Sequence, residues 1–565
     1  MKVVIVGGVA GGATAAARIR RLDEQAEIVV FERSGFVSYA NCGLPYYIGG
    51  VIENPEELTL QTPESFYSRF RISMKVNHEV VAIDSEQKTV AVRNLITGEE
   101  FEESYDKLLL SPGAKPLTAG IPGSDLPKVF TLRTVEDTLK IDEHIKKTQP
   151  KTAVIAGGGF IGIELAENLR DLGMDVSIVQ RPVHLMNPFD PDMAAFIHAE
   201  VRRKGINLVL GHNVAAIGED SQQLQITLEN GDSLQADMVV LAIGVTPDTE
   251  LAKSAGLELG IKGSIIVNDR METSVKDIYA AGDAVQVKHL VTGDDALVSL
   301  AGPANKQGRI AADNICGKNS TYKGSQGSSV IKIFSLTAAA TGLNETNAIK
   351  AGLQVDKVIL SPMNHAGYYP GGKMMSLKVV FEKDTYRLLG AQAVGYGGGV
   401  DKRIDVLAVA IRAGMTAIEL KDLELAYAPP YSSAKDPVNM AGFMAENIAD
   451  GLLEQWFLDE LPQLPRDGSV TLLDVRTKEE YDWAHIKGFV NIPVDELRER
   501  LNEVEKEKTV YLLCESGIRG YIAVRILAAN GYKAYNLAGG YRLYDAVINE
   551  RCILETATAC GRNRK

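Results

Sequence analysis

Two of the five cysteines stand in settings that could do sulfur chemistry. Cys42 precedes a Gly-Leu-Pro segment, which could begin a helix whose N-terminus holds a thiolate. Cys514 opens the run Cys-Glu-Ser-Gly-Ile-Arg, in which backbone N–H groups can cradle a persulfide and Arg519 can compensate its charge. No close-spaced cysteine pair of the metal-ligand kind occurs, so no metal site is expected. The cysteines without a motif are Cys316, Cys552 and Cys560.

A glycine-rich turn near the N-terminus predicts a dinucleotide site. Residues 3–6 read as a buried strand, residues 13–22 as a helix, and residues 28–31 as a second strand that ends on Glu32. The turn follows G-x-G-x-x-G except for Val9, and such a turn brings backbone close to a pyrophosphate while the acid accepts from a ribose hydroxyl. The residues expected to bind this nucleotide are Gly7, Gly8, Val9, Ala10, Gly11, Gly12, Glu32 and Arg33.

The same unit recurs over residues 152–181, where the glycine fingerprint is complete. Gln180 takes the place of the ribose-binding acid and can still bond a 2′-hydroxyl, whereas Arg181 could meet a 2′-phosphate. The sequence therefore favours NADH and leaves NADPH possible. Two such units predict two nucleotides, one that brings electrons and one that holds them. The residues expected at this second site are Gly157, Gly159, Phe160, Ile161, Gly162, Gln180 and Gly244.

Two later segments complete a recognisable pattern. Residues 107–116 read as a strand that breaks into a turn, and residues 273–285 as a strand that ends on Asp283, well placed for flavin ribityl hydroxyls. Together with the glycine turns, they resemble the FAD-dependent pyridine nucleotide-disulfide reductases from residue 1 to about residue 445. The resemblance adds to the FAD-binding set Asn41, Ser111, Pro112, Gly113, Gly282 and Asp283.

Cys42 has no second cysteine to pair with. Dithiol members of this family carry one five residues later, where this chain has Tyr47. The resemblance then implies either a sulfenate, as in NADH oxidases and peroxidases, or a mixed disulfide with a small thiol. Peroxidase-like members carry a histidine where this chain has Ala10, which weakens the peroxide interpretation. The S-x-x-N-C pattern of Ser38, Asn41 and Cys42 resembles coenzyme A-disulfide reductases.

That resemblance implies a set of coenzyme A contacts. Arg18 and Arg21 have the charge to meet its phosphates, although a solvated basic helix face is the competing interpretation. The family's basic residue after Phe66-Tyr67 is matched by Phe70, so Arg69 or Arg71 would have to replace it. The residues implied to bind coenzyme A are Thr14, Arg18, Arg21, Ser38, Asn41, Arg71 and Lys435.

The family also brings residues over the thiol from a partner subunit. Tyr369 and Tyr427 match them, and a phenol there could donate to a leaving thiolate; simple packing of a dimer interface is the alternative. A homodimer with composite active sites is therefore expected.

The C-terminal part resembles rhodaneses. The matching motifs are Leu-Leu-Asp-Val-Arg at 472–476, His-Ile-Lys-Gly at 485–488, Asn-Ile-Pro at 491–493, and the loop that begins at Cys514. Glu515 stands where the family is often basic, and its charge should repel thiosulfate. A thiol persulfide or polysulfide is therefore the expected sulfur donor.

The expected fold is α/β: two Rossmann-like nucleotide-binding domains, an α+β dimerisation domain and a C-terminal rhodanese-like α/β domain. The expected bounds are 1–149 with 266–327 for FAD, 150–265 for NAD(P)H, 328–445 for dimerisation, 446–468 as linker and 469–555 for the rhodanese-like domain.

Composition excludes several classes of function. The 565 residues are 45% hydrophobic and 24% charged, which is ordinary for globular chains. A net charge of −13 disfavours nucleic acid, and no apolar run approaches membrane-spanning length. The N-terminus runs directly into a strand pattern without a signal peptide, so a cytoplasmic location is expected.

These expectations define one function and two alternatives. The chain should be a flavin-dependent NAD(P)H reductase of coenzyme A disulfide, coenzyme A persulfide or polysulfide. NADH would give hydride to FAD, electrons would reduce a Cys42–coenzyme A mixed disulfide, and Cys514 would carry sulfane sulfur to or from coenzyme A. The alternatives are an NADH oxidase or peroxidase with a cysteine sulfenate, and a sulfur-carrier or redox-sensing module.

Overall fold

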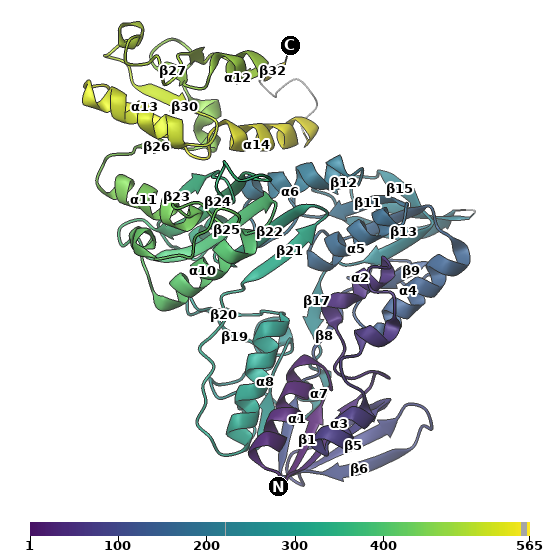
Figure 1. Cartoon of the computed structure of the whole chain (residues 1–565). Coiled ribbons are helices and arrows are strands. Elements are labelled where there is room, and N and C mark those ends of the chain that lie inside the picture. Colours follow the sequence, from purple (N-terminus) through teal and green to yellow (C-terminus); the bar gives the residue numbers. More distant parts are fainter. Residues whose placement is uncertain (221, 555–561, 565) are drawn as a thin grey trace. The chain divides into compact units, whose positions relative to one another are not determined.

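The computed structural model describes residues 1–220, 222–554 and 562–564 (Figure 1). The chain divides into two compact units, one of Met1–Val183 with Gly205–Gly327 and one of His184–Lys204 with Ser328–Lys565. Within the described residues, no helix has both the length and the apolar character needed to cross a membrane.

The first sheet of the first unit is parallel and combines distant chain segments. Its order is β18-β7-β1-β2-β3, and its strands are almost wholly buried, as expected when both faces are covered. The strand after residue 266 lies in this sheet, as the expected split FAD domain requires. The strands are β1 (Lys2–Val6), β2 (Glu27–Glu32), β3 (Ser73–Val76), β7 (Lys107–Leu110) and β18 (Ile278–Ala280).

Two helices lie side by side on this sheet (Figure 1), α1 (Ala10–Leu22) and α8 (Ala301–Ile315). Their backbones approach so closely that a Cβ at Gly308 would lie 2.3 Å from the carbonyl oxygen of Gly11. Glycine is thus required here for helix packing as well as for the turn.

The second sheet is also parallel, in the order β12-β11-β10-β16-β9. The strand β9 precedes residue 150, so this sheet takes one strand from the segment expected to belong to the FAD domain. The elements are β9 (Val129–Thr131), β10 (Thr152–Ala156), α5 (Phe160–Asp171), β11 (Asp175–Gln180), β12 (Asn207–Leu210) and β16 (Met238–Leu241).

Smaller elements complete the first unit. Its other helices are η1 (Asn41–Gly43), α2 (Leu44–Ile48), η2 (Pro55–Leu58), α3 (Pro63–Phe70), α4 (Val135–Thr148), α7 (Glu250–Ser254) and η3 (Ile261–Gly263). Its other strands are β4 (His78–Asp84), β5 (Thr89–Asn94), β6 (Glu100–Ser104), β8 (Ala114–Pro116), β13 (Val214–Asp220), β14 (Gln223–Leu228), β15 (Ser233–Ala236), β17 (Val245–Pro247), β19 (Val287–Lys288) and β20 (Asp295–Ala296).

An antiparallel sheet in the order β21-β22-β25-β24-β23 forms the centre of the second unit. Its strands are β21 (Ser329–Ile333), β22 (Leu336–Gly342), β23 (Val355–Leu360), β24 (Met375–Glu382) and β25 (Leu388–Tyr396). The helices that accompany it are α6 (Pro191–Arg203), α9 (Glu345–Lys350), α10 (Val400–Ala413), η4 (Ile418–Asp422) and α11 (Pro437–Ala449).

A buried lysine fixes α6 within this unit. Lys378 on β24 is 1% exposed, and its Nζ lies 3.1 Å from Asp190, 2.8 Å from Asp192 and 2.8 Å from Glu345. Because a buried charge is stable only when it is paired, residues 184–204 pack with this unit, although the sequence placed them in the NAD(P)H domain.

A parallel sheet of the second unit, in the order β26-β31-β30-β27-β29, carries the Cys514 loop. Its strands are β26 (Gln455–Trp456), β27 (Thr471–Asp474), β29 (Val490–Asn491), β30 (Val510–Leu513) and β31 (Ala534–Leu537), with helices η5 (Leu458–Gln463), α12 (Lys478–Trp483), η6 (Leu501–Glu503), α13 (Ile518–Ala529) and α14 (Gly540–Leu554). β28 (Ala484–Ile486) pairs with β32 (Arg562–Arg564). Cys560 lies outside the described residues.

The expected linker is largely folded. Trp456 is 1% exposed, and its indole N–H donates to the carbonyl oxygen of Leu512 at 2.9 Å. β26 is therefore an edge strand of the same sheet, and this fold begins well before residue 469.

Candidate functional sites

The first glycine turn has the geometry of a nucleotide cradle. Gly7 has φ +97°, and a Cβ there would lie 2.1 Å from the carbonyl oxygen of Ser111. Glu32 is buried; its carboxylate accepts from the N–H of Gly8 at 2.8 Å and of Ser34 at 2.9 Å. Burial raises the pKa of Glu32 in spite of these bonds. The structure thus brings Gly7, Glu32 and Ser111 together, as the sequence predicts.

Asp283 follows β18 and has a partner that the sequence did not reveal. Nη2 of Arg133 lies 2.7 Å from Asp283 Oδ2, and a Cβ at Gly113 would lie 3.6 Å from the same Nη2. The glycine turn at Gly7 offers hydrogen-bond donors, and the carboxylates of Glu32 and Asp283 offer acceptors. Together they form a set that fits FAD. The backbone N–H groups would meet the pyrophosphate, and the acids would meet hydroxyl groups.

The second glycine turn repeats this geometry with a neutral side chain. Oε1 of Gln180 accepts from the N–H of Gly158 at 2.8 Å, matching the bond between Glu32 and Gly8. Gly157 has φ +112°, and Phe160 begins α5. The turn therefore fits a second nucleotide whose ribose would meet an amide instead of a carboxylate.

The Cys42 side chain is exposed and lies in the single turn η1, directly before α2. A helix does begin here as predicted, but it spans only five residues. Nearby protein atoms desolvate the thiol and raise the pKa of Cys42, and the charge of Glu164 raises it further, while Arg133 opposes this. These surroundings oppose the stabilisation of a thiolate that a helix N-terminus offers.

Glu164 on α5 is a titratable group that the sequence did not single out. The hydroxyl of Tyr46 donates to Glu164 Oε1 at 3.3 Å. Burial raises the pKa of Glu164 to about 7, the bond from Tyr46 opposes the rise, and Glu167 adds to it. A carboxyl group that changes charge near neutral pH thus lies in the electrostatic surroundings of Cys42.

Ser38 connects the cysteine segment to the first glycine turn. It has φ +48°, and its N–H donates to the carbonyl oxygen of Gly8 at 2.9 Å. This bond holds the start of the segment that carries Asn41 and Cys42 against the first glycine turn.

The residues of α1 that are expected to bind coenzyme A differ in their exposure and in their partners. Arg21 is exposed, whereas Nε of Arg18 lies 2.7 Å from Asp313 on α8. Thr14 donates to Asn305. The pairing with Asp313 reduces the charge that Arg18 can offer to a phosphate.

Arg71 ends α3 in the left-handed region, with φ +51°. Its guanidinium carbon lies 5.2 Å from the centre of the Tyr67 ring. The side chain is exposed, so it lies where a phosphate could reach it.

Tyr369, Tyr427 and Lys435 lie in the second unit, and all three are exposed. The hydroxyl groups of Tyr427 and Tyr368 form a hydrogen bond of 2.8 Å, a pairing that no sequence motif predicts.

A buried arginine holds the two tyrosine-bearing loops. Arg403 is fully buried; it donates to the carbonyl oxygen of Asn364 at 3.1 Å and to Asp436 at 2.9 Å. These bonds connect the segment before Tyr369 with the segment after Tyr427. Arg403 thus links the two segments that flank Tyr369 and Tyr427.

The Cys514 loop forms the expected anion nest in part. Cys514 is fully buried, and the N–H of Gly517 donates to its sulfur at 3.1 Å. Burial raises the pKa of the Cys514 thiol, while backbone N–H groups of the loop and Arg519 oppose the rise. From behind, the N–H of Tyr541 donates to the Cys514 carbonyl oxygen at 2.7 Å.

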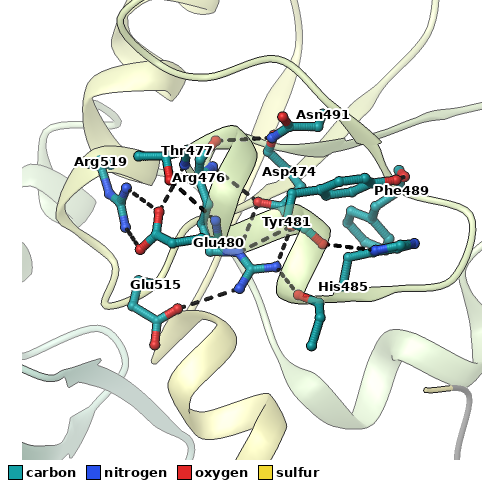
Figure 2. A network of polar contacts seen from close by, with 11 residues as sticks. Asp474, Arg476, Thr477, Glu480, Tyr481, His485, Phe489, Asn491, Glu515 and Arg519 are labelled. Carbon is teal, nitrogen blue, oxygen red and sulfur yellow. Dashed lines mark hydrogen bonds and ion pairs between the residues drawn. The ribbon is translucent and has the colours of Figure 1, made fainter. Parts of the chain in front are cut away.

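Figure 2 shows a charged network around this loop. Both terminal nitrogens of Arg519 lie 2.7 Å from the carboxylate oxygens of Glu480. Arg476 lies 2.7 Å from Asp474 and 3.5 Å from Glu515. The sequence predicted that Arg519 compensates a sulfur anion, but in the structure its guanidinium already has a carboxylate partner.

The chain belongs to the pyridine nucleotide-disulphide oxidoreductase family. Residues 1–308 match the family description "Pyridine nucleotide-disulphide oxidoreductase", residues 328–437 match its dimerisation domain, and residues 457–546 match the rhodanese-like domain. These matches confirm the resemblance and the fold class. FAD and NAD(P)H are the cofactors that this family implies, and the glycine turns fit both.

Three similar proteins narrow the class. A coenzyme A disulfide reductase of Staphylococcus aureus (strain JH9) is 40% identical over 79% of this chain and 100% of its own length. A Bacillus anthracis structure described as reduced CoADR-RHD has a TM-score of 0.94 and 47% identity, covering 97% of this chain and 98% of its own. An NAD-dependent persulfide reductase from A. fulgidus has a TM-score of 0.90 and 38% identity, covering 96% and 100%.

Proposed function

We propose that the chain is a flavin-dependent NAD(P)H reductase of coenzyme A disulfide and coenzyme A persulfide, with Cys42 as its single redox cysteine. One observation carries this proposal: Cys42 is exposed beside the nucleotide cradle, and the buried Tyr47 stands where a second cysteine would be needed. A lone thiol at this place must find its sulfur partner in the substrate. The names of the similar proteins support coenzyme A disulfide and persulfides as substrates.

The chemistry balances with one thiol. The Cys42 thiolate attacks coenzyme A disulfide, forms a mixed disulfide with one half, and releases the other half as a thiolate that takes up a proton. Two electrons from NADH then cleave the mixed disulfide and return both sulfurs to the thiolate state. Bound FAD supplies the two-electron chemistry between the nicotinamide and this disulfide.

Residues of the chain bind the coenzyme A phosphates, hold a proton near Cys42 and select the nicotinamide donor. Arg21 and Arg71 are exposed cations available to the coenzyme's phosphates. The carboxyl group of Glu164 holds a proton near neutral pH in the surroundings of Cys42. NADH is the favoured donor, because the amide of Gln180 can bond a 2′-hydroxyl, while Arg181 leaves NADPH possible.

Tyr369 and Tyr427 act from the partner subunit in this proposal. The matched dimerisation domain supports a homodimer, and both phenols are exposed in the single chain, where they can donate to a leaving thiolate. The rhodanese-like domain transfers sulfane sulfur through Cys514, with a thiol persulfide or polysulfide as donor because Glu515 disfavours thiosulfate.

The test is release of coenzyme A from the oxidised enzyme. Denaturation followed by a reductant should free about one coenzyme A per chain, and Cys42→Ser should free none. The variant should retain FAD and its reduction by NADH but lose coenzyme A disulfide turnover. Cys316→Ser is the matched control and should behave as wild type. A sulfenic acid on Cys42 without an adduct would instead support the oxidase alternative.

A further inference from the structure

The Cys514 loop is lined by charged side chains that are already paired with one another. Its two cations are Arg476 and Arg519, and its three anions are Asp474, Glu480 and Glu515 (Figure 2). Arg476 is 1% exposed, and its guanidinium carbon lies 3.7 Å from the centre of the Tyr541 ring, so it cannot turn outward. Arg519 is thus the cation of this network that a donor in solvent could reach.

Glu480 holds Arg519 with matched geometry. Two N–H···O contacts of 2.7 Å join them, the two-point arrangement that makes arginine–carboxylate pairs strong. The bond from Arg519 lowers the pKa of Glu480 to about 2, so the carboxylate is charged throughout the neutral range. The pair is only partly buried, with side chains about one third exposed, so solvent weakens it.

A second set of bonds orients Glu480 independently of the arginine. Glu480 closes a capping box at the start of α12, because its carboxylate accepts from the N–H of Thr477 at 2.8 Å. The Thr477 hydroxyl in turn accepts from the N–H of Glu480. The carboxylate is therefore held in place before any donor arrives.

We propose that Glu480 is a specificity-determining residue of the sulfur-transfer site: by occupying Arg519, it disfavours thiosulfate beyond the repulsion expected from Glu515 and leaves the site to thiol persulfides. The inference rests on the proposed sulfur transfer at Cys514. With thiosulfate, the Cys514 thiolate takes the outer sulfur, the S–S bond breaks, and sulfite leaves with two negative charges. With a thiol persulfide, the same attack releases a thiol, so no sulfonate group needs a cation.

The consequence is that removal of one carboxylate should widen the donor range. In Glu480→Gln the amide oxygen can still accept from Thr477, so α12 keeps its cap, while Arg519 loses its charged partner. A charge-assisted hydrogen bond to the sulfonate would then form, which corresponds to a gain of roughly ten- to a hundredfold in kcat/KM for thiosulfate. The kcat/KM for a thiol persulfide should change less than about twofold.

The experiment uses the full chain and two donors, thiosulfate and glutathione persulfide. Sulfite release and thiol release are measured for wild type, Glu480→Gln and Glu479→Gln. Glu479 is the matched control, because it is an exposed carboxylate on the same helix and has no described contact with Arg519. Glu479→Gln removes the same charge as Glu480→Gln. A retained rate with glutathione persulfide shows that Glu480→Gln is folded.

The outcomes distinguish a failure of this proposal from a failure of the proposed sulfur transfer at Cys514. A thiosulfate gain confined to Glu480→Gln supports the assignment. Equal gains in both variants would show a general charge effect and overturn it, as would an unchanged or lower thiosulfate rate in Glu480→Gln. If the wild-type Cys514 forms no persulfide with either donor by mass spectrometry, sulfur transfer itself fails, and this proposal falls with it.

Discussion

Gly540 offers a direct test of whether the Cys514 loop must keep its present shape. The residue begins α14 with φ +65°, and a Cβ there would lie 2.6 Å from the Cys514 carbonyl oxygen and 2.7 Å from that of Glu515. These distances are about 0.8 Å short of ordinary contact. Both neighbours are backbone, so Gly540→Ala must displace the loop itself.

The expected magnitudes follow from strain and overlap. An alanine at this φ costs about 1–2 kcal/mol, and overlap in a packed region adds about 1–3 kcal/mol. Unfolding of the second unit should therefore require about 2–5 kcal/mol less free energy. A loop displaced by close to 1 Å should lose roughly tenfold to a hundredfold in sulfur transfer.

Gly451 provides the matched control. It has φ +66°, and a Cβ there would meet no atom within 4 Å. Gly451→Ala should therefore carry the backbone strain alone and keep sulfur transfer near wild type. The assay is thiol release from glutathione persulfide, with NADH oxidation by coenzyme A disulfide as the internal check that the chain is folded. If both alanine variants transfer sulfur equally, the argument about the loop is wrong.

Three further predictions follow from the sites. Glu164→Gln should remove an inflection near pH 7 from the pH profile of coenzyme A disulfide reduction. The reason is that the native carboxyl group ionises as the pH rises through about 7, and its charge then opposes the Cys42 thiolate. An identical pH profile in both proteins would count against this. Cys514→Ser should abolish sulfur transfer and leave coenzyme A disulfide reduction intact, as sulfide release and NADH oxidation will show. Mixing Cys42→Ser with Tyr427→Phe chains should give heterodimers more active than either parent; no gain would contradict composite sites.

The local signals in the sequence predicted much of the fold. The structure has both glycine turns, the strands around them and the rhodanese-like motifs at the predicted positions. Each of these features depends on residues that are close in sequence. Glu480 also carried a local signal, since Thr477 and Glu480 have the spacing of a capping box. Its pairing with Arg519, 39 residues away, had none.

The remaining site residues depend on packing between distant segments. Tyr46 and Glu164 are separated by 118 positions, and Arg133 and Asp283 by 150. No periodicity or motif encodes such pairs, because they form only when whole elements come together. The same reason explains why the sequence did not reveal that α6 packs with the second unit.

The folded linker limits how far the rhodanese-like domain can move. Only residues 450–454 separate α11 from β26, and the rhodanese-like sheet belongs to the same compact unit as the antiparallel sheet. The N–H of Gly539 donates to the Ile359 carbonyl oxygen at 3.1 Å, and the Tyr521 hydroxyl donates to Asn447 at 3.1 Å. These contacts fix the domain beside the antiparallel sheet.

The far end of the domain is fixed as well. Glu550 on α14 lies 3.2 Å from His198 and 3.0 Å from Arg202, both on α6. Ala195 and Ile359 also join the apolar core around Trp456.

A flexible tether would raise the local concentration of one thiol at another by letting a domain sweep through solution. These contacts remove that freedom, because moving the domain would expose the shared core to water. In the proposed function, coenzyme A would take up the sulfur at Cys514, and its long arm suits a carrier that moves without the domain. Deleting residues 460–565 would uncover the same core, so loss of activity in such a truncation could reflect instability, whereas Cys514→Ser tests the chemistry alone.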